Sequence, residues 1–131
     1  MRYLLDVNAL IAFGIVQHQF HERIVQWVAS QRGSAFLTTP VTEIGFTRVV
    51  ASMPGYQLGV SEAKNLLVEI KINPDQPLQF VPDDAEISSM PNWVRTPAHV
   101  TGGHLVQLAT DHQAVLATLD ERIPGSLIIP N

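Results

Sequence analysis

The chain has 131 residues, no cysteine and a formal net charge of -4. A chain of this length buries roughly two-thirds of the surface that it exposes when unfolded, so it can fold without disulfides or a structural metal. The absence of cysteine excludes a disulfide scaffold, and the negative charge argues against a broad basic surface for nucleic acid. No apolar run approaches the ~20 residues of a membrane-spanning helix. We therefore expect one domain, residues 1–131, in the cytoplasm and away from membranes.

The N-terminal region starts with a strand and two helices. Arg2–Asp6 is a short apolar run typical of a buried strand, and it ends on a carboxylate. A helix is expected to begin at Asn8, whose side chain can cap it. In the next helix, apolar residues recur at the spacing of one helical face: Phe20, Ile24, Trp27 and Val28. Arg32 and Gly33 end this helix.

The rest of the chain alternates in the same way, with Pro and Gly at the turns. The apolar runs typical of strands are 35–38, 78–81, 114–118 and 127–129. The helical patterns are 40–53, capped by Thr39, 61–73, capped by Ser61, a short helix over 90–94, and 101–112. Because short apolar strands alternate with helices, we expect an α/β/α sandwich with a mainly parallel central sheet.

Two acids follow predicted strands. Asp6 ends the first strand, and Asp120 lies two residues beyond the strand over 114–118. Ligands of parallel sheets bind beyond the carboxyl ends of the strands, so we expect these acids to share one crevice. Two ionised carboxylates repel unless a cation neutralises them, and Mg²⁺ and Mn²⁺ prefer oxygen ligands. The alternative is that both acids only cap helices.

Glu43 strengthens the metal interpretation. On the helix over 40–53 it lies at the margin of the apolar stripe, where a carboxylate needs a partner or a path to solvent. Arg48 lies five residues further on and points away, so it is a poor partner within the helix. The alternative is that Glu43 lies on a solvent-exposed side of its helix and needs no partner.

Four segments together resemble the motif series of PIN-domain proteins, specifically the VapC-type toxins of bacterial toxin-antitoxin systems: 5–11, 42–48, 100–105 and 116–120. The resemblance spans nearly the whole chain. It implies a PIN-like fold, a homodimer, a cognate antitoxin and a Mg²⁺- or Mn²⁺-dependent endoribonuclease that cleaves RNA. By position, it implies that Asp6, Glu43 and Asp120 are the metal ligands and catalytic acids. Asn8 and Thr118 match the polar positions that orient them.

The sequence departs from the family pattern at Gly102, because the family usually has an acid after the residue that corresponds to Thr101. The family pattern has four carboxylates, and this chain keeps three of them, so we expect at least one metal site to be weakened. Three explanations stay open: a natural member with reduced activity, an inactivated variant, or a working site in which water or substrate phosphate fills the gap. Arg122, two residues after Asp120, is the leading candidate for contacting the substrate phosphate.

Two other functions stay open. A catalytically dead PIN module would still bind an antitoxin or RNA, and Gly102 favours it. A phosphotransfer domain with Asp6 as its nucleophile is a weaker alternative, because it leaves Glu43 unexplained. Of the two tryptophans that could stack on RNA bases, Trp27 fits the helical core better, and Trp93 stays an open question. The nuclease interpretation requires the three acids to converge in one pocket.

Overall fold

Five short parallel strands form the centre of the protein, in a computed structural model that describes residues 1–131. They are β1 (Arg2–Leu5), β2 (Ala35–Thr38), β3 (Leu78–Phe80), β4 (Val115–Thr118) and β5 (Leu127–Ile128). Their order in the sheet is β3-β2-β1-β4-β5, and every neighbouring pair is parallel. The predicted α/β class and parallel sheet are confirmed.

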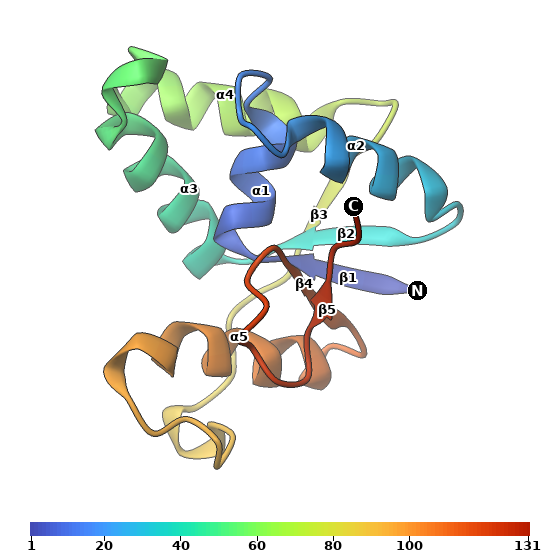
Figure 1. Cartoon of the computed structure of the whole chain (residues 1–131), viewed down its shortest axis with the longest axis vertical. Coiled ribbons are helices and arrows are strands. Elements are labelled where there is room, and N and C mark those ends of the chain that lie inside the picture. Colours follow the sequence, from blue (N-terminus) through green and yellow to red (C-terminus); the bar gives the residue numbers. More distant parts are fainter.

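Helices cover both faces of the sheet (Figure 1). They are α1 (Val7–Gly14), α2 (His21–Ser30), α3 (Pro40–Ser52), α4 (Val60–Ile72) and α5 (Val100–Asp111). Helices α1 to α4 lie on one face, and α5 lies on the other. Short 3-10 turns are η1 (Pro54–Tyr56), η2 (Ile87–Ser89) and η3 (Pro97–His99). None of the helices combines the length and the apolar character that crossing a membrane would require.

The core explains why the strands read as continuous apolar runs. Successive strand residues point to opposite faces, so Tyr3 packs in the larger cluster beneath α1 to α4, and Leu4 packs in the smaller cluster beneath α5. Trp27 is 5% exposed and makes edge contacts with Tyr3 and Phe36, at ring-centroid distances of 4.9 and 5.6 Å. Trp27 is therefore a core residue and is not available to stack on RNA.

The cap of α1 differs from the prediction. The Asp6 carboxylate, not the Asn8 side chain, accepts the first free N–H of the helix, that of Val7, at 2.8 Å. Asn8 lies inside the first turn, so its amide group is free to make contacts elsewhere. The sequence pattern places the helix correctly but assigns its cap two residues too late.

Thr39 is the predicted N-cap residue of α3, with Pro40 at the first helical position, but it does not cap through its side chain, and the predicted cap of the next helix by Ser61 is wrong. The buried hydroxyl of Thr39 has no hydrogen-bond partner, and Thr42 instead accepts the N–H of Thr39 at 3.0 Å. Helix α4 begins one residue before Ser61, and the Glu62 carboxylate accepts the N–H of Gly59 at 3.0 Å. In both helices, a side chain from the first turn reaches back to the backbone that precedes the helix.

The segment before α5 forms a turn and not the predicted helix over 90–94. The N–H of Val94 donates to the carbonyl of Pro91 at 3.1 Å. The turn packs closely on α5 at Gly103, where a Cβ atom would lie only 2.2 Å from Cγ2 of Val94. The absence of a side chain at Gly103 thus lets the segment over 90–94 lie directly on the first turn of α5.

Candidate active site

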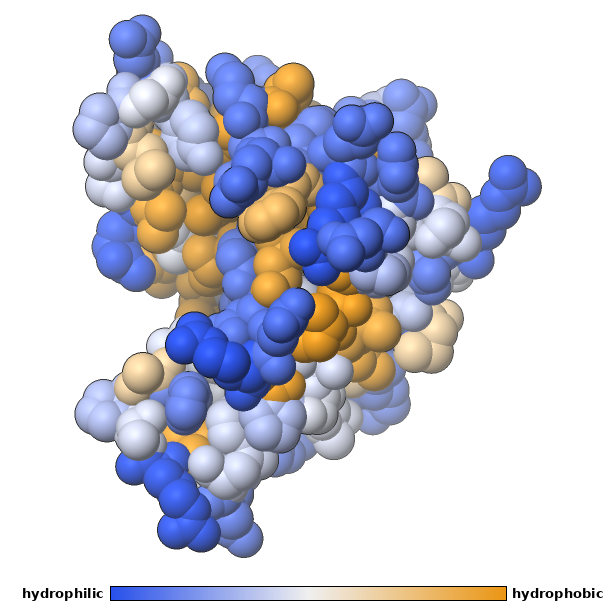
Figure 2. Space-filling model, viewed as in Figure 1, coloured by the Kyte–Doolittle hydropathy of each residue, from blue (hydrophilic) through white to orange (hydrophobic).

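A pocket of about 400 Å³ opens beyond the carboxyl ends of β1 and β4. Figure 2 shows this face hollowed between the part of the molecule that carries α3 and the part that carries α5. The polar and ring-bearing side chains that line the pocket are those of Asp6, Asn8, Arg48, Trp93, His99, Thr101 and Asp120. The pocket therefore lies where a parallel sheet ordinarily binds its ligand.

Asp6 is held in place from two sides. Its side chain caps α1 through Oδ1, which accepts the Val7 N–H, and Oδ2 accepts the hydroxyl of Thr118 at 2.8 Å. The residue is only 8% exposed. A carboxylate has about four acceptor positions, and these contacts use two of them, so Asp6 keeps capacity for a further ligand.

Thr118 connects the two predicted acids. Its hydroxyl donates to Asp6 and accepts the N–H of Asp120 at 3.0 Å and the side-chain amide of Asn8 at 3.2 Å. Asn8 in turn accepts the N–H of Leu119 at 3.0 Å. The two residues predicted to orient the acids thus form one hydrogen-bonded network with them, which joins the start of α1 to the end of β4.

Removing the Thr118 hydroxyl should weaken this network. Thr118→Val keeps the shape of the side chain but leaves the donors of Asp120 and Asn8 without their acceptor, so we expect a loss of about 1–3 kcal/mol in the free energy of unfolding. The pKa of Asp6 should rise further, because the bond from Thr118 lowers it. Denaturant unfolding and an NMR titration of the Asp6 carboxyl would measure both effects. Thr118→Ser is the matched control, and equal behaviour of the Val and Ser variants would contradict the prediction.

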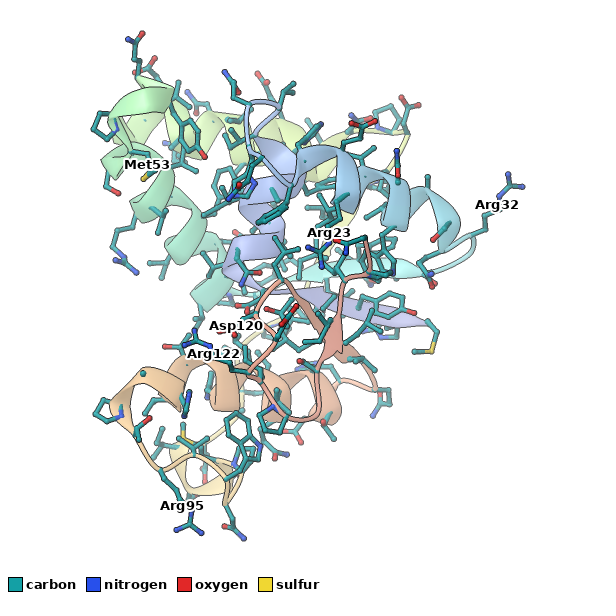
Figure 3. The ribbon with its side chains drawn as sticks, in the orientation of Figure 1. Arg23, Arg32, Met53, Arg95, Asp120 and Arg122 are labelled. Carbon is teal, nitrogen blue, oxygen red and sulfur yellow. The ribbon has the colours of Figure 1, made fainter.

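The two acids differ in how readily they ionise. Burial raises the pKa of Asp6 above its ordinary value, and the nearby charge of Asp120 adds to this. Asp120 shows the opposite effect. The hydrogen bonds that the guanidinium of Arg122 donates to the Asp120 carboxylate lower the pKa of Asp120. The Nε and a terminal nitrogen of Arg122 donate to the two carboxylate oxygens at 2.9 and 3.1 Å (Figure 3). Of the two carboxylates, Asp6 is therefore the one whose ionised form is disfavoured, and a cation in the pocket would stabilise that form.

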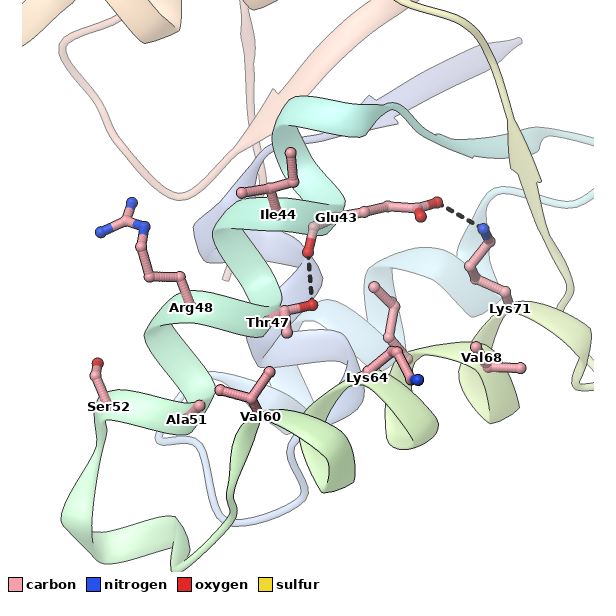
Figure 4. Close-up of a pocket in the computed structure, with 11 residues that line it drawn as sticks. Glu43, Ile44, Thr47, Arg48, Ala51, Ser52, Val60, Lys64, Val68 and Lys71 are labelled. Carbon is pink, nitrogen blue, oxygen red and sulfur yellow. Dashed lines mark hydrogen bonds and ion pairs between the residues drawn. The ribbon is translucent and has the colours of Figure 1, made fainter.

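Glu43 does not join this pair. Its Oε2 accepts hydrogen bonds from Lys71 Nζ at 2.6 Å and from the Thr38 hydroxyl at 2.5 Å. It lines a different groove of about 710 Å³ between α3 and α4, where Figure 4 shows it directed at Lys71. No group of three acidic or histidine side chains is close enough to hold a metal ion. The expected convergence of three acids is thus absent from this conformation, which brings only Asp6 and Asp120 together.

The pocket contains a residue that the sequence motifs do not identify. His99 lies close enough to Asp120 to lower the pKa of that carboxyl, and its Nδ1 is 3.1 Å from the Thr96 hydroxyl. His104, which is nearer to Gly102 in the sequence, instead pairs with Asp83 at 2.7 Å. The sequence feature that could have identified His99 is its position just before the helix that carries Gly102.

Gly102 lines the same pocket as the two acids. A Cβ atom at this position would lie 3.2 Å from Cδ1 of Ile123, which is the flexible end of that side chain. A small shift of Ile123 would therefore admit a side chain at the position where the sequence lacks the expected acid.

Comparison with known proteins reveals related sequences. No protein-family model matches the chain. It is 33% identical over 122 residues to ribonuclease VapC38 of Mycobacterium tuberculosis, which covers 89% of this chain and 84% of that protein. It is 30% identical over 129 residues to ribonuclease VapC44 of the same species, with coverage of 94% and 89%.

Solved structures share the fold at lower sequence identity. Mycobacterium tuberculosis VapC20, described as a sarcin-ricin loop cleaving toxin, matches with a TM-score of 0.67 at 12% identity, over 97% of this chain and 98% of that one. VapBC2 from Rickettsia felis, bound to a DNA fragment from its promoter, matches with a TM-score of 0.61 at 14% identity, over 97% and 96%. At these identities the matches establish the arrangement of strands and helices.

Proposed function

The chain belongs to the VapC family of PIN-domain proteins, and on that premise we propose that it is a metal-dependent endoribonuclease, the toxin of a toxin-antitoxin pair. The observation that carries the proposal is the pairing of Asp6 with Asp120 in a pocket at the carboxyl ends of β1 and β4. The proposed site therefore starts from two acids and not from the three converging acids that the sequence interpretation required, since Glu43 is paired with Lys71. An Asp-nucleophile phosphotransfer domain, the weaker alternative from the sequence, lacks this family support.

The donor set of the pocket suits a hard divalent cation. Asp6 and Asp120 offer oxygen atoms only, and Mg²⁺ is commonly bound through one or two carboxylates, with water and substrate phosphate completing its shell. We propose that these two residues hold Mg²⁺ or Mn²⁺. When bound, the cation would stabilise the negative charge that develops on the phosphate during hydrolysis.

The remaining residues of the network would act by positioning. Thr118 fixes one oxygen of Asp6, and Asn8 fixes Thr118, so the two acids are held relative to each other before any ligand enters. Arg122 is the proposed contact to the substrate phosphate. Its guanidinium now pairs with Asp120, and a cation on that carboxylate would release it for the phosphate.

We propose that Glu43 is a third acid of the site. To bind the cation, Glu43 must release Lys71, with which it is now paired. Lys71→Met should then increase the affinity for Mn²⁺, about tenfold, because it removes the competing ammonium group. Glu43→Gln should decrease the affinity by a similar factor. Calorimetric titration with Mn²⁺ measures both. If both variants bind Mn²⁺ as the wild type does, Glu43 has only the structural role that its contacts with Lys71 and Thr38 describe.

The proposal extends to the partners of the protein. We propose RNA as the substrate, a cognate antitoxin as the protein partner, and a homodimer in the cytoplasm as the working form, with residues 1–131 acting as one domain. The antitoxin is supported by the structural neighbours, which include VapBC complexes from Rickettsia felis and Salmonella typhimurium.

RNA cleavage with and without divalent cations tests the proposed function. The wild-type protein should cleave RNA in Mg²⁺ or Mn²⁺ and stop when EDTA is added. A protein that binds antitoxin tightly but cleaves no RNA in either ion would instead support the catalytically dead module, for which Gly102 is the motivating observation.

A further inference from the structure

We propose that Trp93 and His99 form an aromatic wall that binds one unpaired nucleobase of the RNA next to the cleaved phosphate. The proposal rests on the ribonuclease function proposed above and deepens it by assigning a base-binding site. The two rings line the same pocket as Asp6 and Asp120. A nucleotide whose phosphate lies at the acids would therefore have its base within reach of the wall.

The two rings pack as a unit. Their centroids are 6.2 Å apart and their planes are inclined by 59°, so the face of one ring is not covered by the face of the other. His99 is further fixed by the contact of Nδ1 with the Thr96 hydroxyl at 3.1 Å. Both residues are partly exposed, in contrast to Trp27, which is 5% exposed and enclosed by the core.

The wall is anchored to α5. Val94, the residue after Trp93, packs on Gly103 at a distance that no side chain at position 103 would allow. Its N–H also closes a turn to the carbonyl of Pro91. Trp93 is thus carried by a fixed turn, although it lies outside the regular helices and strands. A rigid aromatic ring loses little conformational freedom when a ligand stacks on it.

The chemistry of the pocket favours a nucleobase over other flat ligands. Aromatic side chains bind bases of any sequence, because every base has a π-face. The pocket volume of about 400 Å³ is within the range of small-ligand sites. A base in a duplex is already stacked on its neighbours, so the wall should select single-stranded RNA.

Binding to a fluorescently labelled single-stranded oligoribonucleotide tests the wall, in an Asp6→Asn background that prevents cleavage. Trp93→Leu should weaken binding by about 5- to 150-fold, since stacking of one base on an aromatic ring contributes about 1–3 kcal/mol. Trp93→Phe keeps a ring and should bind within a few-fold of the parent. With the unaltered protein, an oligonucleotide of the same length that is abasic at every residue should bind as weakly as the intact oligonucleotide binds to the Leu variant.

Several results would overturn the proposal. They are equal binding by the parent and Trp93→Leu, equal binding of the intact and abasic oligonucleotides, or binding of a duplex as tight as that of the single strand. The abasic comparison uses no variant of Trp93, so it decides the matter even if the Leu variant fails to fold. Cleavage by the wild-type protein is measured separately. Cleavage without an effect of Trp93 rejects only the wall, whereas Trp93-dependent binding without cleavage rejects the ribonuclease function.

Discussion

Replacing Asp6 by Asn is expected to abolish RNA cleavage and, at the same time, to make the protein gain stability relative to the wild type as the pH rises. The loss of activity should be about a hundredfold or more, because the substitution removes one of the two charges proposed to hold the cation. Asn has one carbonyl oxygen, so it can replace only one of the two acceptors of Asp6, and if it keeps the hydrogen bond from Thr118, the N–H of Val7 loses its partner. Cleavage in saturating Mn²⁺ and denaturant unfolding in EDTA measure the two effects.

The gain in stability follows from the raised pKa of Asp6. Burial disfavours its ionised form in the folded state, so the carboxylate destabilises the protein at pH values above its folded pKa. Below the ordinary aspartate range the group is protonated in both states, and this penalty disappears. The lost hydrogen bond lowers the free energy of unfolding of Asp6→Asn equally at every pH, whereas the difference from the wild type should move in favour of the variant as the pH rises through the folded pKa of Asp6.

The exposed acid Asp111, at the end of α5, is the matched control for this substitution. Asp111→Asn should leave RNA cleavage unchanged. Retained cleavage by Asp6→Asn would contradict the role of Asp6 in the site, and a stability difference that does not change with pH would contradict the electrostatic description of it.

Gly102→Asp is expected to increase both Mn²⁺ affinity and RNA cleavage, by about tenfold each, which corresponds to 1.4 kcal/mol. The new carboxylate would enter the pocket that already holds Asp6 and Asp120 and would need only a small displacement of Ile123. In the metal-free protein, the favourable interaction of the new acid with the dipole of α5 is opposed by repulsion from Asp6 and Asp120.

Two control variants separate charge from shape in this prediction. Gly102→Ala adds the Cβ atom alone, and Gly102→Asn adds a side chain of the same shape without the charge. Calorimetry with Mn²⁺ and a cleavage assay should place both controls near the wild type. Equal affinity and equal rate in all four proteins would show that the missing acid does not limit the site.

The meeting of Asp6 and Asp120 could be predicted from sequence because it depends on topology. Each residue follows an apolar run short enough for a strand, and parallel strands bring their carboxyl ends to one edge. The position of Asn8 beside Thr118 follows from the same alignment of β1 with β4. Local pattern and sheet order suffice for this half of the site.

The environment of Glu43 could not be predicted in the same way. Its partner Lys71 lies on another helix, and the periodicity of α3 does not say how α4 crosses it. Periodicity shows only that a carboxylate at the edge of an apolar stripe needs a partner. The prediction of three converging acids assumed that this partner would be a cation in the pocket.

The positions of Trp93 and His99 could not be predicted from sequence patterns, for a different reason. The sequence predicts a short helix over 90–94, which the structure replaces by a turn, and two prolines interrupt the segment over 90–99. Its position depends on the close approach of Val94 to Gly103, a contact that only the folded chain brings about. Trp93 could therefore be identified as a candidate but not placed.

A calorimetric titration of Mn²⁺ into the metal-free protein tests the central claim most directly, namely that Asp6 and Asp120 together form a cation site. We predict saturable binding to the wild type at pH 7 and its disappearance in the double variant Asp6→Asn, Asp120→Asn, which should remain folded. The absence of binding to the wild type, or unchanged binding to the folded double variant, would contradict the account.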